Sequence, residues 1–576
     1  MPIALSVLYH GLVCLPYSTF LSRQIEAPRK MLRLPPPLSH PVLIARKLLL
    51  LATVIQGIRS KDSDRLCGMN IDSQTVMARA FDTATRLVTS NDELVVGPLE
   101  GIECVILESM YHNNAGNLRR AWLTNRRAMV LAQMTGLHTM SPHTTTVLEE
   151  ETRERVDPTY MWARLNFSDR YLSLMLGLPQ GSPDDLFATP EALGRCGPME
   201  RLERVAAVAG GLILKRNAAE RTDLANTMRV DKMLREAAEL MPPEWWLPTP
   251  RTAVLAGDNA DAFEESLRLM YHITHRHLLM QLHLPYMLLH SSGGKYDYSK
   301  AAATDASRAI LTQYVSFRDS MSTAYCRGVD FIAFIASTTL CIAHIERVRQ
   351  RRGDDAGGGM TRLQAFRHNR LSDRGLLERV LQIMKTMARA ENDAVALKIS
   401  TILRPLLQIE GQSHGMGLSF RVCADAEAKR EALQPFEHRE NVGSLRIQIP
   451  YLGTIRIDKC APEGAGTPQP VDTGFVGLCD VVSPQTEPPS IATLNGVTGE
   501  TDWQAAPQST HSLDGLERPA LDHLGSASGA GDAHGSGQML IPGLTTDRNE
   551  WALQGVETAL FNNLINPFTE FNQHGI

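Results

Sequence analysis

The chain has 576 residues, which is too long for one hydrophobic core and long enough for two or three domains. Its formal net charge of −5 argues against a strongly basic, nucleic-acid-binding body, and its 43% of hydrophobic residues are enough to bury a sizeable core. The nine cysteines stand singly, with no pair at the spacing of a zinc cluster, so reduced thiols in the cytosol or nucleus are expected.

The N-terminal residues do not match a targeting or membrane segment. The apolar stretch 3–20 has no basic residue before it and is interrupted by His10, which argues against a secretory signal. The apolar run 41–58 contains Arg46 and Lys47, which argues against a membrane span. We therefore expect a soluble protein with no membrane partner.

Helical periodicity follows almost without interruption to about residue 409. Asp157 and Pro158 form an N-cap followed by proline at the first helical position, and Gly177 is placed to end that helix. The glycine-rich run 353–359 is expected to be an exposed, flexible link. The predicted helices are 41–59, 73–90, 98–112, 117–135, 158–176, 200–216, 222–241, 261–290, 300–319, 324–350 and 373–409.

Residues 98–138 predict a helical hairpin around which the chain is organised. Asn113-Asn114-Ala115-Gly116 ends its first helix, Asn117 is placed as the N-cap of the second, and Gly136 closes it. The second helix has an apolar stripe in which Asn125 is the polar member, and Trp122 of this stripe is expected to share one buried core with Trp162. The stripe is flanked by Arg119, Arg120, Arg126 and Arg127, for which a solvated or ion-paired edge is favoured over a phosphate contact.

The character of the sequence changes after residue 409. The segments 445–449 and 454–457 alternate apolar and polar residues around a short turn, which predicts a β-hairpin. Residues 458–548 are rich in Gly, Pro and Ser and hold twelve acidic residues against three basic ones, as in a disordered linker. Residues 549–571 predict an amphipathic helix, which either docks on the helical body or engages a coactivator as an activation segment. The apolar face of that helix carries Trp551, Val556, Leu560, Phe561 and Leu564.

These patterns predict an all-α fold with a small β-hairpin near its C-terminal end and a disordered tail. Its expected parts are an N-terminal segment of uncertain structure (1–37), a helical domain (38–457), an acidic linker (458–548) and a C-terminal helix (549–571).

Candidate catalytic and metal-binding groups have simpler explanations. His275 and His283 share one helix face but are eight positions apart, with no intervening glutamate base, so packed or capping histidines are favoured for them and for neighbouring His272 and His277. Asp184-Asp185 and Asp354-Asp355 fit turns better than a magnesium site. Gly210-Gly211 fits close helix packing. With no nucleophile elbow, P-loop or dinucleotide fingerprint, the chain is not expected to be an enzyme and needs no cofactor of its own.

A basic cluster ends the helix predicted at 324–350. Cations at a helix C-terminus interact favourably with the helix dipole, which is one explanation for them. A nuclear-import segment is the other. The cluster consists of Arg347, Arg349, Arg351 and Arg352.

Two segments carry a family resemblance. Residues 100–138, the first hallmark segment, contain Gly116-Asn117, Arg119-Arg120-Ala121-Trp122, Arg127-Ala128 and Gly136-Leu137-His138. Residues 161–181, the second hallmark segment, contain Trp162, Asp169-Arg170, Leu176-Gly177 and Pro179. With Met241–Trp246, His283–Tyr286 and the predicted hairpin, they resemble the regulatory middle homology region of fungal zinc-cluster transcription factors, of the xylanolytic activator type. The resemblance covers about 40–457 and the terminal 551–561.

The resemblance implies a nuclear regulator of RNA polymerase II genes, acting on carbon or secondary metabolism as an activator. It also implies DNA binding through a six-cysteine zinc cluster, dimerisation with itself or with related factors, and a coactivator partner. Only Cys14 and Cys67 precede the first hallmark segment, so this sequence contains no such cluster. Either the sequence is a truncated gene product, or the protein is a DNA-independent interaction protein that dimerises with and modulates full-length factors.

Overall fold

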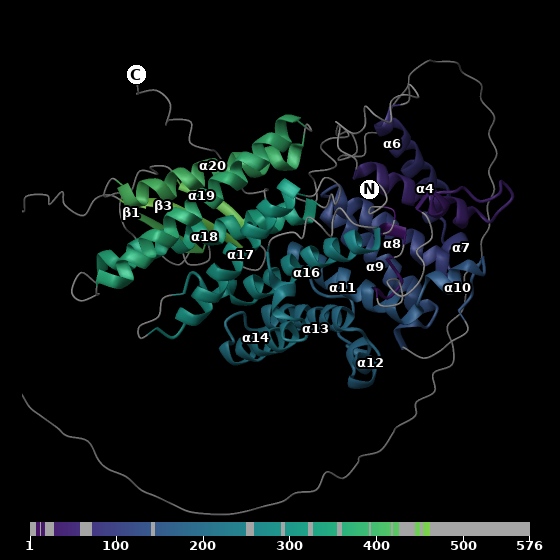
Figure 1. Ribbon diagram of the computed structural model, residues 1–576, viewed down its shortest axis with the longest axis horizontal. Coiled ribbons are helices and arrows are strands. Elements are labelled where there is room, and N and C mark those ends of the chain that lie inside the picture. Colours follow the sequence, from purple (N-terminus) through teal and green to yellow (C-terminus); the bar gives the residue numbers. More distant parts are fainter. Residues whose placement is uncertain are drawn as a thin grey trace, which may run out of the picture. The chain divides into compact units, whose positions relative to one another are not determined.

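The computed structural model describes residues 7, 9–11, 13–17, 28–57, 72–139, 145–248, 259–289, 294–320, 327–353, 360–390, 393–415, 419–424, 444–449 and 453–460 (Figure 1). All of these lie in one compact unit that contains Met1–Glu463. The longer helices are α4 (Pro41–Gln56), α6 (Ser73–Ala84), α8 (Leu99–Asn114), α9 (Leu118–Met134), α11 (Pro158–Leu176), α13 (Pro198–Ala219), α14 (Leu224–Ala238), α16 (Asn259–His283), α17 (Asp297–Ser320), α18 (Arg327–Gly353), α19 (Met360–Ala390) and α20 (Ala394–Gly415).

Short helical turns connect these helices. The short α-helices are α3 (Pro28–Met31), α7 (Asp92–Val95), α10 (Glu151–Arg155) and α12 (Pro190–Gly194). The 3-10 turns are Leu137–Thr139, Leu186–Ala188, Pro243–Trp246 and Leu284–Tyr286, and a π-helical turn, Thr85–Thr89, follows α6. The predicted all-α class is thereby confirmed for the described residues.

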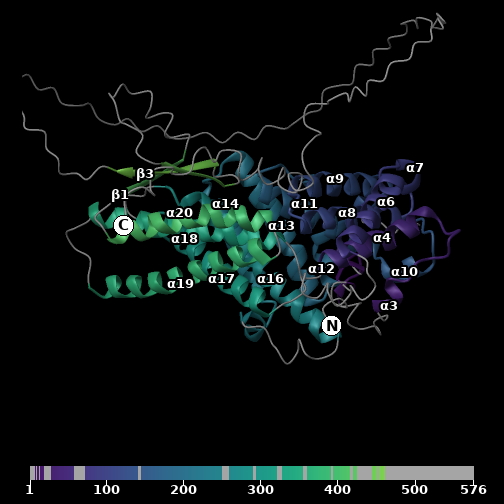
Figure 2. The ribbon, with the colours of Figure 1, turned by 90° about the horizontal axis from the view of Figure 1, so that it is seen from above.

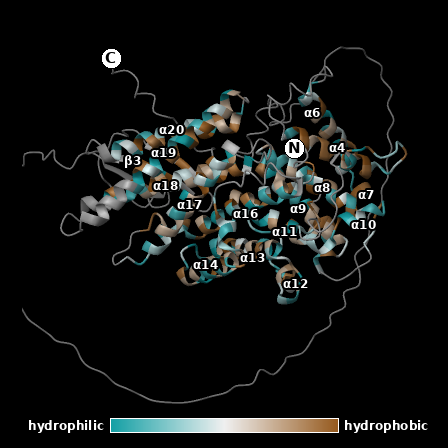
Figure 3. Cartoon of the chain, viewed as in Figure 1, coloured by the Kyte–Doolittle hydropathy of each residue, from teal (hydrophilic) through white to brown (hydrophobic). Residues whose placement is uncertain are grey.

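Neighbouring helices pack pairwise around three large hydrophobic clusters and a small fourth one formed by Leu269 and Phe317. The N-terminal cluster is built on α4, α8, α9 and α11, with members such as Leu49, Ile102 and Trp162. The C-terminal cluster extends from α11 and α13 to α20, with members such as Ile310, Phe334 and Leu406. A third cluster joins α4 and α16 to residues near the N-terminus. Each long helix accordingly carries both hydrophobic and hydrophilic residues (Figure 3).

A three-stranded antiparallel sheet lies over α18 and α20 (Figure 2). The predicted hairpin is confirmed by β2 (Ser444–Ile449) and β3 (Gly453–Cys460), in which Leu445 faces Ile457 and Ile447 faces Ile455. The third strand, β1 (Ser419–Ala424), was not predicted, and it pairs with β3. This strand is short and its partner is about 35 residues away, so local periodicity carries little sign of it.

Helix α11 begins and ends at the predicted capping residues. Asp157 accepts hydrogen bonds from the backbone N–H groups of Thr159 and Tyr160 at 2.8 and 2.9 Å, and Pro158 occupies the first turn. Gly177 ends the helix with a φ of 71°, a conformation that costs glycine little.

Two predicted helix boundaries near the end of the helical region are wrong. Helix α19 begins at Met360 rather than 373, directly after the glycine-rich link. The predicted helix 373–409 is two helices, because Asp393 accepts hydrogen bonds from the N–H groups of Val395 and Ala396 and starts α20 as a new helix. A cap of this kind starts a new helix without interrupting the hydrophobic periodicity of the sequence, so periodicity alone does not reveal the boundary.

The expectation that Trp122 and Trp162 share one core is also wrong. Trp162 is 2% exposed within the N-terminal cluster, whereas Trp122 is only partly buried and packs against the C-terminal cluster. The two side chains lie on different helices, α9 and α11, and heptad-like spacing within each helix does not say which neighbour it faces.

Among the described residues, α18 contains a stretch that is long and apolar enough to cross a membrane, Arg327–Arg349. Its apolar window is fully buried by the surrounding helices, as expected of a core helix.

Candidate functional site

The turn between α8 and α9 brings the first hallmark segment close to α18 and α20. Gly116 has a φ of 83°, and a Cβ there would meet side-chain atoms of Arg327 and Val395 at 3.3 Å. Ser109 Oγ donates to the carbonyl of Ala121 at 2.8 Å and ties the two helices together. Asn117 stands at the predicted N-cap position, but its side chain makes no capping hydrogen bond.

The two hallmark segments meet at a cluster centred on Trp122. The indole Nε1 donates to Ser173 Oγ at 3.0 Å, and the Arg126 guanidinium lies 4.5 Å from the centre of the Trp122 ring. Arg126 also forms an ion pair with Asp169 of the second segment. Burial raises the pKa of Asp169, against the lowering effect of the Gly181 N–H and Arg126. Residues that resemble the family motif in sequence are thus joined in space.

Part of the basic edge of α9 is ion-paired, as predicted. Arg127 Nη2 lies 2.6 Å from Asp92 Oδ1, in addition to the pair formed by Arg126 and Asp169. The side chains of Arg119 and Arg120 are exposed.

Arg170 of the second hallmark segment anchors the loop after α11. Its guanidinium is buried and donates to Asp185 Oδ1 at 2.6 Å and to the carbonyls of Ala207 and Ser182. A Cβ on Gly211 would lie 2.9 Å from Arg170 Cζ, so Gly211 allows the close packing that was predicted for the glycine pair on α13, whereas a Cβ on Gly210 would make only ordinary contacts at 3.6 Å or more. Asp184 and Asp185 therefore bind an arginine within a loop.

A buried carboxylate that sequence reasoning missed holds α4, α8 and α10 together. Glu103 on α8 forms an ion pair with Arg46, in which Arg46 Nε lies 2.8 Å from Glu103 Oε2, and a second ion pair with Arg155. Burial would raise the pKa of Glu103, but the two guanidinium groups lower it overall. Arg46, which argued against a membrane span, is thus a buried structural residue whose own pKa is lowered by burial.

The histidines of α16 are buried and occupied by structural contacts. His272 Nε2 lies 2.6 Å from the carbonyl of Trp245, and its ring stacks on Trp246. His283 Nε2 lies 3.2 Å from Asp231 Oδ1. Burial lowers the pKa of His272 and His277 to about 4 and that of His275 to about 3, so these three rings are neutral at pH 7. The preference for packed histidines is confirmed by these contacts.

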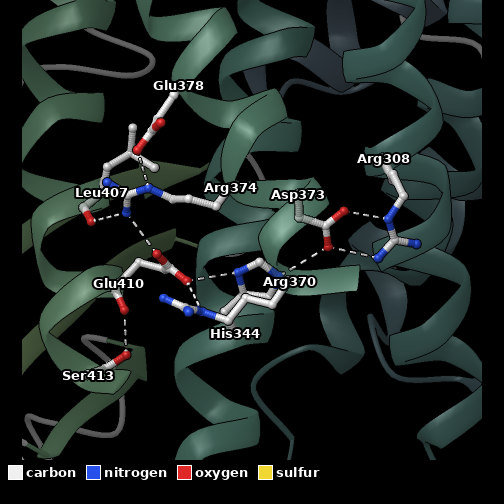
Figure 4. A network of polar contacts seen from close by, with 9 residues as sticks. All are labelled: Arg308, His344, Arg370, Asp373, Arg374, Glu378, Leu407, Glu410 and Ser413. Carbon is white, nitrogen blue, oxygen red and sulfur yellow. Dashed lines mark hydrogen bonds and ion pairs between the residues drawn. The ribbon is translucent and has the colours of Figure 1, made fainter. Parts of the chain in front are cut away.

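An ionic network joins α17, α18, α19 and α20 (Figure 4). His344 lies at its centre, with Nδ1 3.2 Å from Glu410 Oε1 and Nε2 3.2 Å from Asp373 Oδ2. Arg308 approaches Asp373 at 2.6 Å, and Arg370 and Arg374 each approach Glu410 at 2.8 Å.

The geometry of this network favours a protonated His344. Both ring nitrogens face carboxylate oxygens, and only the imidazolium can donate to both. Burial opposes the charge, but the hydrogen bonds to Asp373 and Glu410 raise the pKa of His344 overall. Burial also opposes ionisation of the two carboxyl groups, and the surrounding cations nevertheless lower the pKa of each to about 2.

The candidate import cluster lies at the end of α18, one turn beyond His344. Arg347 and Arg349 are half-buried, and Arg349 Nε lies 3.6 Å from Glu346. The side chains of Arg351 and Arg352 lie outside the described residues, so the import role stays a prediction. The acidic linker beyond Cys460 and the candidate activation segment with Trp551, Val556, Leu560, Phe561 and Leu564 also lie outside them.

The residues present do not fit the zinc cluster that the resemblance implies. Four described cysteines, Cys14, Cys104, Cys196 and Cys341, are free thiols in different parts of the chain. Burial raises the pKa of Cys14 and Cys104 far above the ordinary value, which opposes the thiolate form that binds zinc. Within the described ranges no group of three His, Cys, Asp or Glu residues is arranged to hold a metal ion.

Comparison with known proteins identifies relatives along almost the whole chain. No model of a known protein family matches, and no solved structure matches. The dehydrocurvularin biosynthesis regulator of Alternaria cinerariae is 32% identical over 617 aligned positions, covering 99% of this chain and 78% of that protein. The protein of the same name from Aspergillus terreus is 37% identical, covering 78% of this chain and 61% of its own length.

A third relative points to the same class of protein. A probable transcription factor of Penicillium aethiopicum is 31% identical over 92% of this chain and 74% of its own length. None of these three names describes an enzyme. The chain therefore belongs to the family of fungal transcription factors and biosynthesis regulators that these proteins represent.

Proposed function

We propose that this protein is a nuclear regulator of RNA polymerase II genes that serve a pathway of secondary metabolism. The observation that carries the proposal is the similarity to a biosynthesis regulator over 99% of the chain. The names of the relatives from Alternaria cinerariae and Aspergillus terreus refer to biosynthesis of one secondary metabolite, which supports the class of pathway.

Within this proposal the helical body is a regulatory domain of the zinc-cluster factor type. Its support is the contact between the two hallmark segments, through Trp122, Ser173, Arg126 and Asp169. Because these residues contact one another, a common structural role explains their resemblance to the family motifs better than chance similarity does. The C-terminal segment 549–571 then recruits a coactivator, and the body restrains or transmits that activity.

A reporter fusion tests the proposal. The full chain joined to a heterologous DNA-binding domain should activate a reporter gene in a fungal host. Trp551→Ala should weaken the activation several-fold, whereas Trp503→Ala, a tryptophan change within the acidic linker, should leave it unchanged. A fusion that is present in the nucleus and silent would remove the activator function.

A fluorescent fusion tests the nuclear location and the import cluster separately. The intact chain should accumulate in the nucleus, and replacement of Arg347, Arg349, Arg351 and Arg352 by alanine should reduce that accumulation. The exposed Arg119 and Arg120 provide the matched control, because replacing them removes surface charge without touching the cluster. If the variant with all four arginines replaced still accumulates in the nucleus, the cluster is not an import signal, and its role is to interact with the C-terminal end of the helix dipole.

The second candidate function is modulation of full-length factors by dimerisation. The support for it is the dimerisation with related factors that the resemblance to zinc-cluster factors implies. A transcript map across the 5′ end of the gene separates the two candidates. An in-frame, cysteine-rich exon would favour a DNA-binding activator, and its absence, together with co-purification of a related factor, would favour the modulator.

A further inference from the structure

One face of α9 exposes large apolar side chains. Leu123, Val130 and Met134 are 56%, 52% and 63% exposed. Their spacing of seven and four residues places them on one stripe of the helix, about 16 Å long at a rise of about 1.5 Å per residue. The opposite face is buried in the body through residues such as Ala121 and Ala128. Single exposed apolar residues are common, but three on one stripe are typical of an interaction surface.

The charges at the two ends of α9 are the reverse of those that its own dipole favours. The N-terminal end of a helix dipole is positive, yet Arg119 and Arg120 lie exposed in the first turn of α9, which contains no acidic residue. The last turn contains no basic residue. The preceding helix, α8, follows the usual pattern, with Glu100 in its first turn. The arginines of α9 would therefore be stabilised by the C-terminal end of a second helix that runs antiparallel to it.

The exposed stripe is self-complementary in an antiparallel pair of α9 helices. When the centre of the pair lies between Arg126 and Arg127, Leu123 lies opposite Val130 of the partner subunit. Apolar side chains then meet apolar side chains, as an interface made of two identical surfaces requires. The same alignment places Arg119 beside the last carbonyl groups of the partner's helix, where a cation is favourable.

Like charges do not oppose this arrangement. The two copies of Arg119 lie at opposite ends of the pair, about 22 Å apart along the axis, which is more than twice the screening length of about 8 Å at physiological salt. Arg126 and Arg127, at the centre, are paired with Asp169 and Asp92 of their own chain. The pair of helices therefore gains apolar contacts without bringing uncompensated cations together.

We propose that the exposed face of α9 binds the same face of a second copy of this chain, as an antiparallel pair of helices. One pair of helices of this length gives an interface at the low end of the range for specific complexes, roughly 1,000 Å² in total. The dimer should therefore be weak, with a dissociation constant on the order of 10 µM. This self-association does not depend on the proposed role in transcription.

Sedimentation velocity of the purified full chain tests the proposal, over a concentration series from about 1 to about 200 µM. We expect monomer at the low end of the series and dimer at the high end. Leu123→Lys should raise the dissociation constant about tenfold or more, because it replaces an apolar contact by a cation near the central arginines. Leu397→Lys is the matched control. Leu397 is 57% exposed on α20, so the same change there should leave the dissociation constant unchanged.

Arg119→Glu separates association from folding. A glutamate in the first turn suits the dipole of its own helix, so the melting temperature of the monomer, measured at low concentration, should stay the same or rise. In the dimer the same glutamate lies beside the C-terminal end of the partner's helix, so the dissociation constant should rise about fivefold. A change that acted through misfolding would lower the melting temperature instead.

Disulfide cross-linking determines the direction of the helix pair. When a Leu123→Cys protein is mixed with a Val130→Cys protein, the two new cysteines lie opposite each other, within the Cα separation of about 7 Å that a disulfide allows. In the Leu123→Cys protein alone, the two new cysteines lie about 10 Å apart along the axis. We therefore expect a cross-linked dimer from the mixture, and from either variant alone no more than the wild-type background.

Four results would overturn the proposal. The first is a monomer across the whole concentration series. The second is an equal effect of Leu123→Lys and Leu397→Lys, which would place the association on another surface. The third is cross-linking of the Leu123→Cys protein with itself, which would mean a parallel pair. The fourth is a dimer that forms only after deletion of residues 549–576, which would assign the exposed face of α9 to that segment.

The proposed function can fail independently of this surface. A silent reporter fusion together with the expected self-association would reject the activator function and leave the dimer interface standing.

Discussion

Buried charged side chains in this protein form ion pairs with residues of neighbouring elements, so removing one charge should destabilise the fold. Glu103 is an example. Its carboxylate is almost completely buried between Arg46 and Arg155. Glu103→Gln removes the negative charge but keeps the shape, leaving two guanidinium groups without their counterion. We expect a loss of about 3–5 kcal/mol in the free energy of unfolding, measured by urea denaturation.

The control for this change is Glu191→Gln, which alters an exposed glutamate on α12 and should shift stability by less than about 0.5 kcal/mol. If the two variants had the same free energy of unfolding, the charge of Glu103 would make no net contribution to stability.

The two tryptophans of the hallmark segments should differ in their contribution to stability. Trp162→Ala removes a fully buried ring and should cost about 3–5 kcal/mol. Trp122→Ala should cost less, about 1–2 kcal/mol, because that ring is partly exposed and contributes one hydrogen bond and one contact with Arg126. Paired melting curves check the order, and a larger loss at Trp122 would contradict it.

At the scale of helices, the network around His344 makes the packing of α17 to α20 depend on pH. The folded state raises the pKa of His344 above the unfolded value of about 6.5. The stability that this gives is fully present below pH 6.5 and is lost as the pH rises through the folded-state pKa. Asp373 and Glu410, with a pKa of about 2, stay ionised throughout that range.

We therefore expect the urea midpoint of the intact protein to fall between pH 6 and pH 9. His344→Gln should be less stable at pH 6 and should show a flatter pH profile, because the titrating group is gone. The wild-type and variant profiles are compared in the same buffers, so other titrating groups cancel. Parallel profiles would mean that His344 is neutral in the folded protein.

At the scale of the whole molecule, the open question is whether the predicted C-terminal helix belongs to the helical body. Deletion of residues 549–576 separates the two alternatives. If the segment recruits a coactivator, as we propose, the melting temperature of the body should stay within about 1 °C. A body of about 420 residues shifts by only about 1 °C for each kcal/mol lost, so the loss of a docked apolar helix, worth several kcal/mol, is needed to exceed that limit. Reporter activation should be lost at the same time. A clear drop in melting temperature would instead show that the segment docks on the body.

Much of the fold is predictable because its causes are local. The Asp157 cap, the Gly177 stop and the positive φ at Gly116 and Gly136 are properties of a few consecutive residues, and the structure confirms each. The β2–β3 hairpin is equally local, since alternation and a short turn determine its register.

The candidate sites were less predictable because their parts come from distant positions. The sequence indicated that 100–138 and 161–181 matter, but not that Arg126 pairs with Asp169 or that Trp122 faces Ser173. The network of His344, Asp373 and Glu410 spans 66 residues and has no spacing that a motif could describe. A cavity lined by Ile106, Ile273 and Ile332 is formed by several helices and exists only where their packing leaves space.

The sequence by itself therefore determined the helical class, most helix ends, the hairpin and the resemblance to a family of regulators, because periodicity, capping and turn chemistry act over a few residues. Only the tertiary structure decided which charges are buried, which tryptophan lies in the core and where the cavity lies. Those features depend on which helix faces meet, and the free energy of that packing is shared among side chains far apart in the chain.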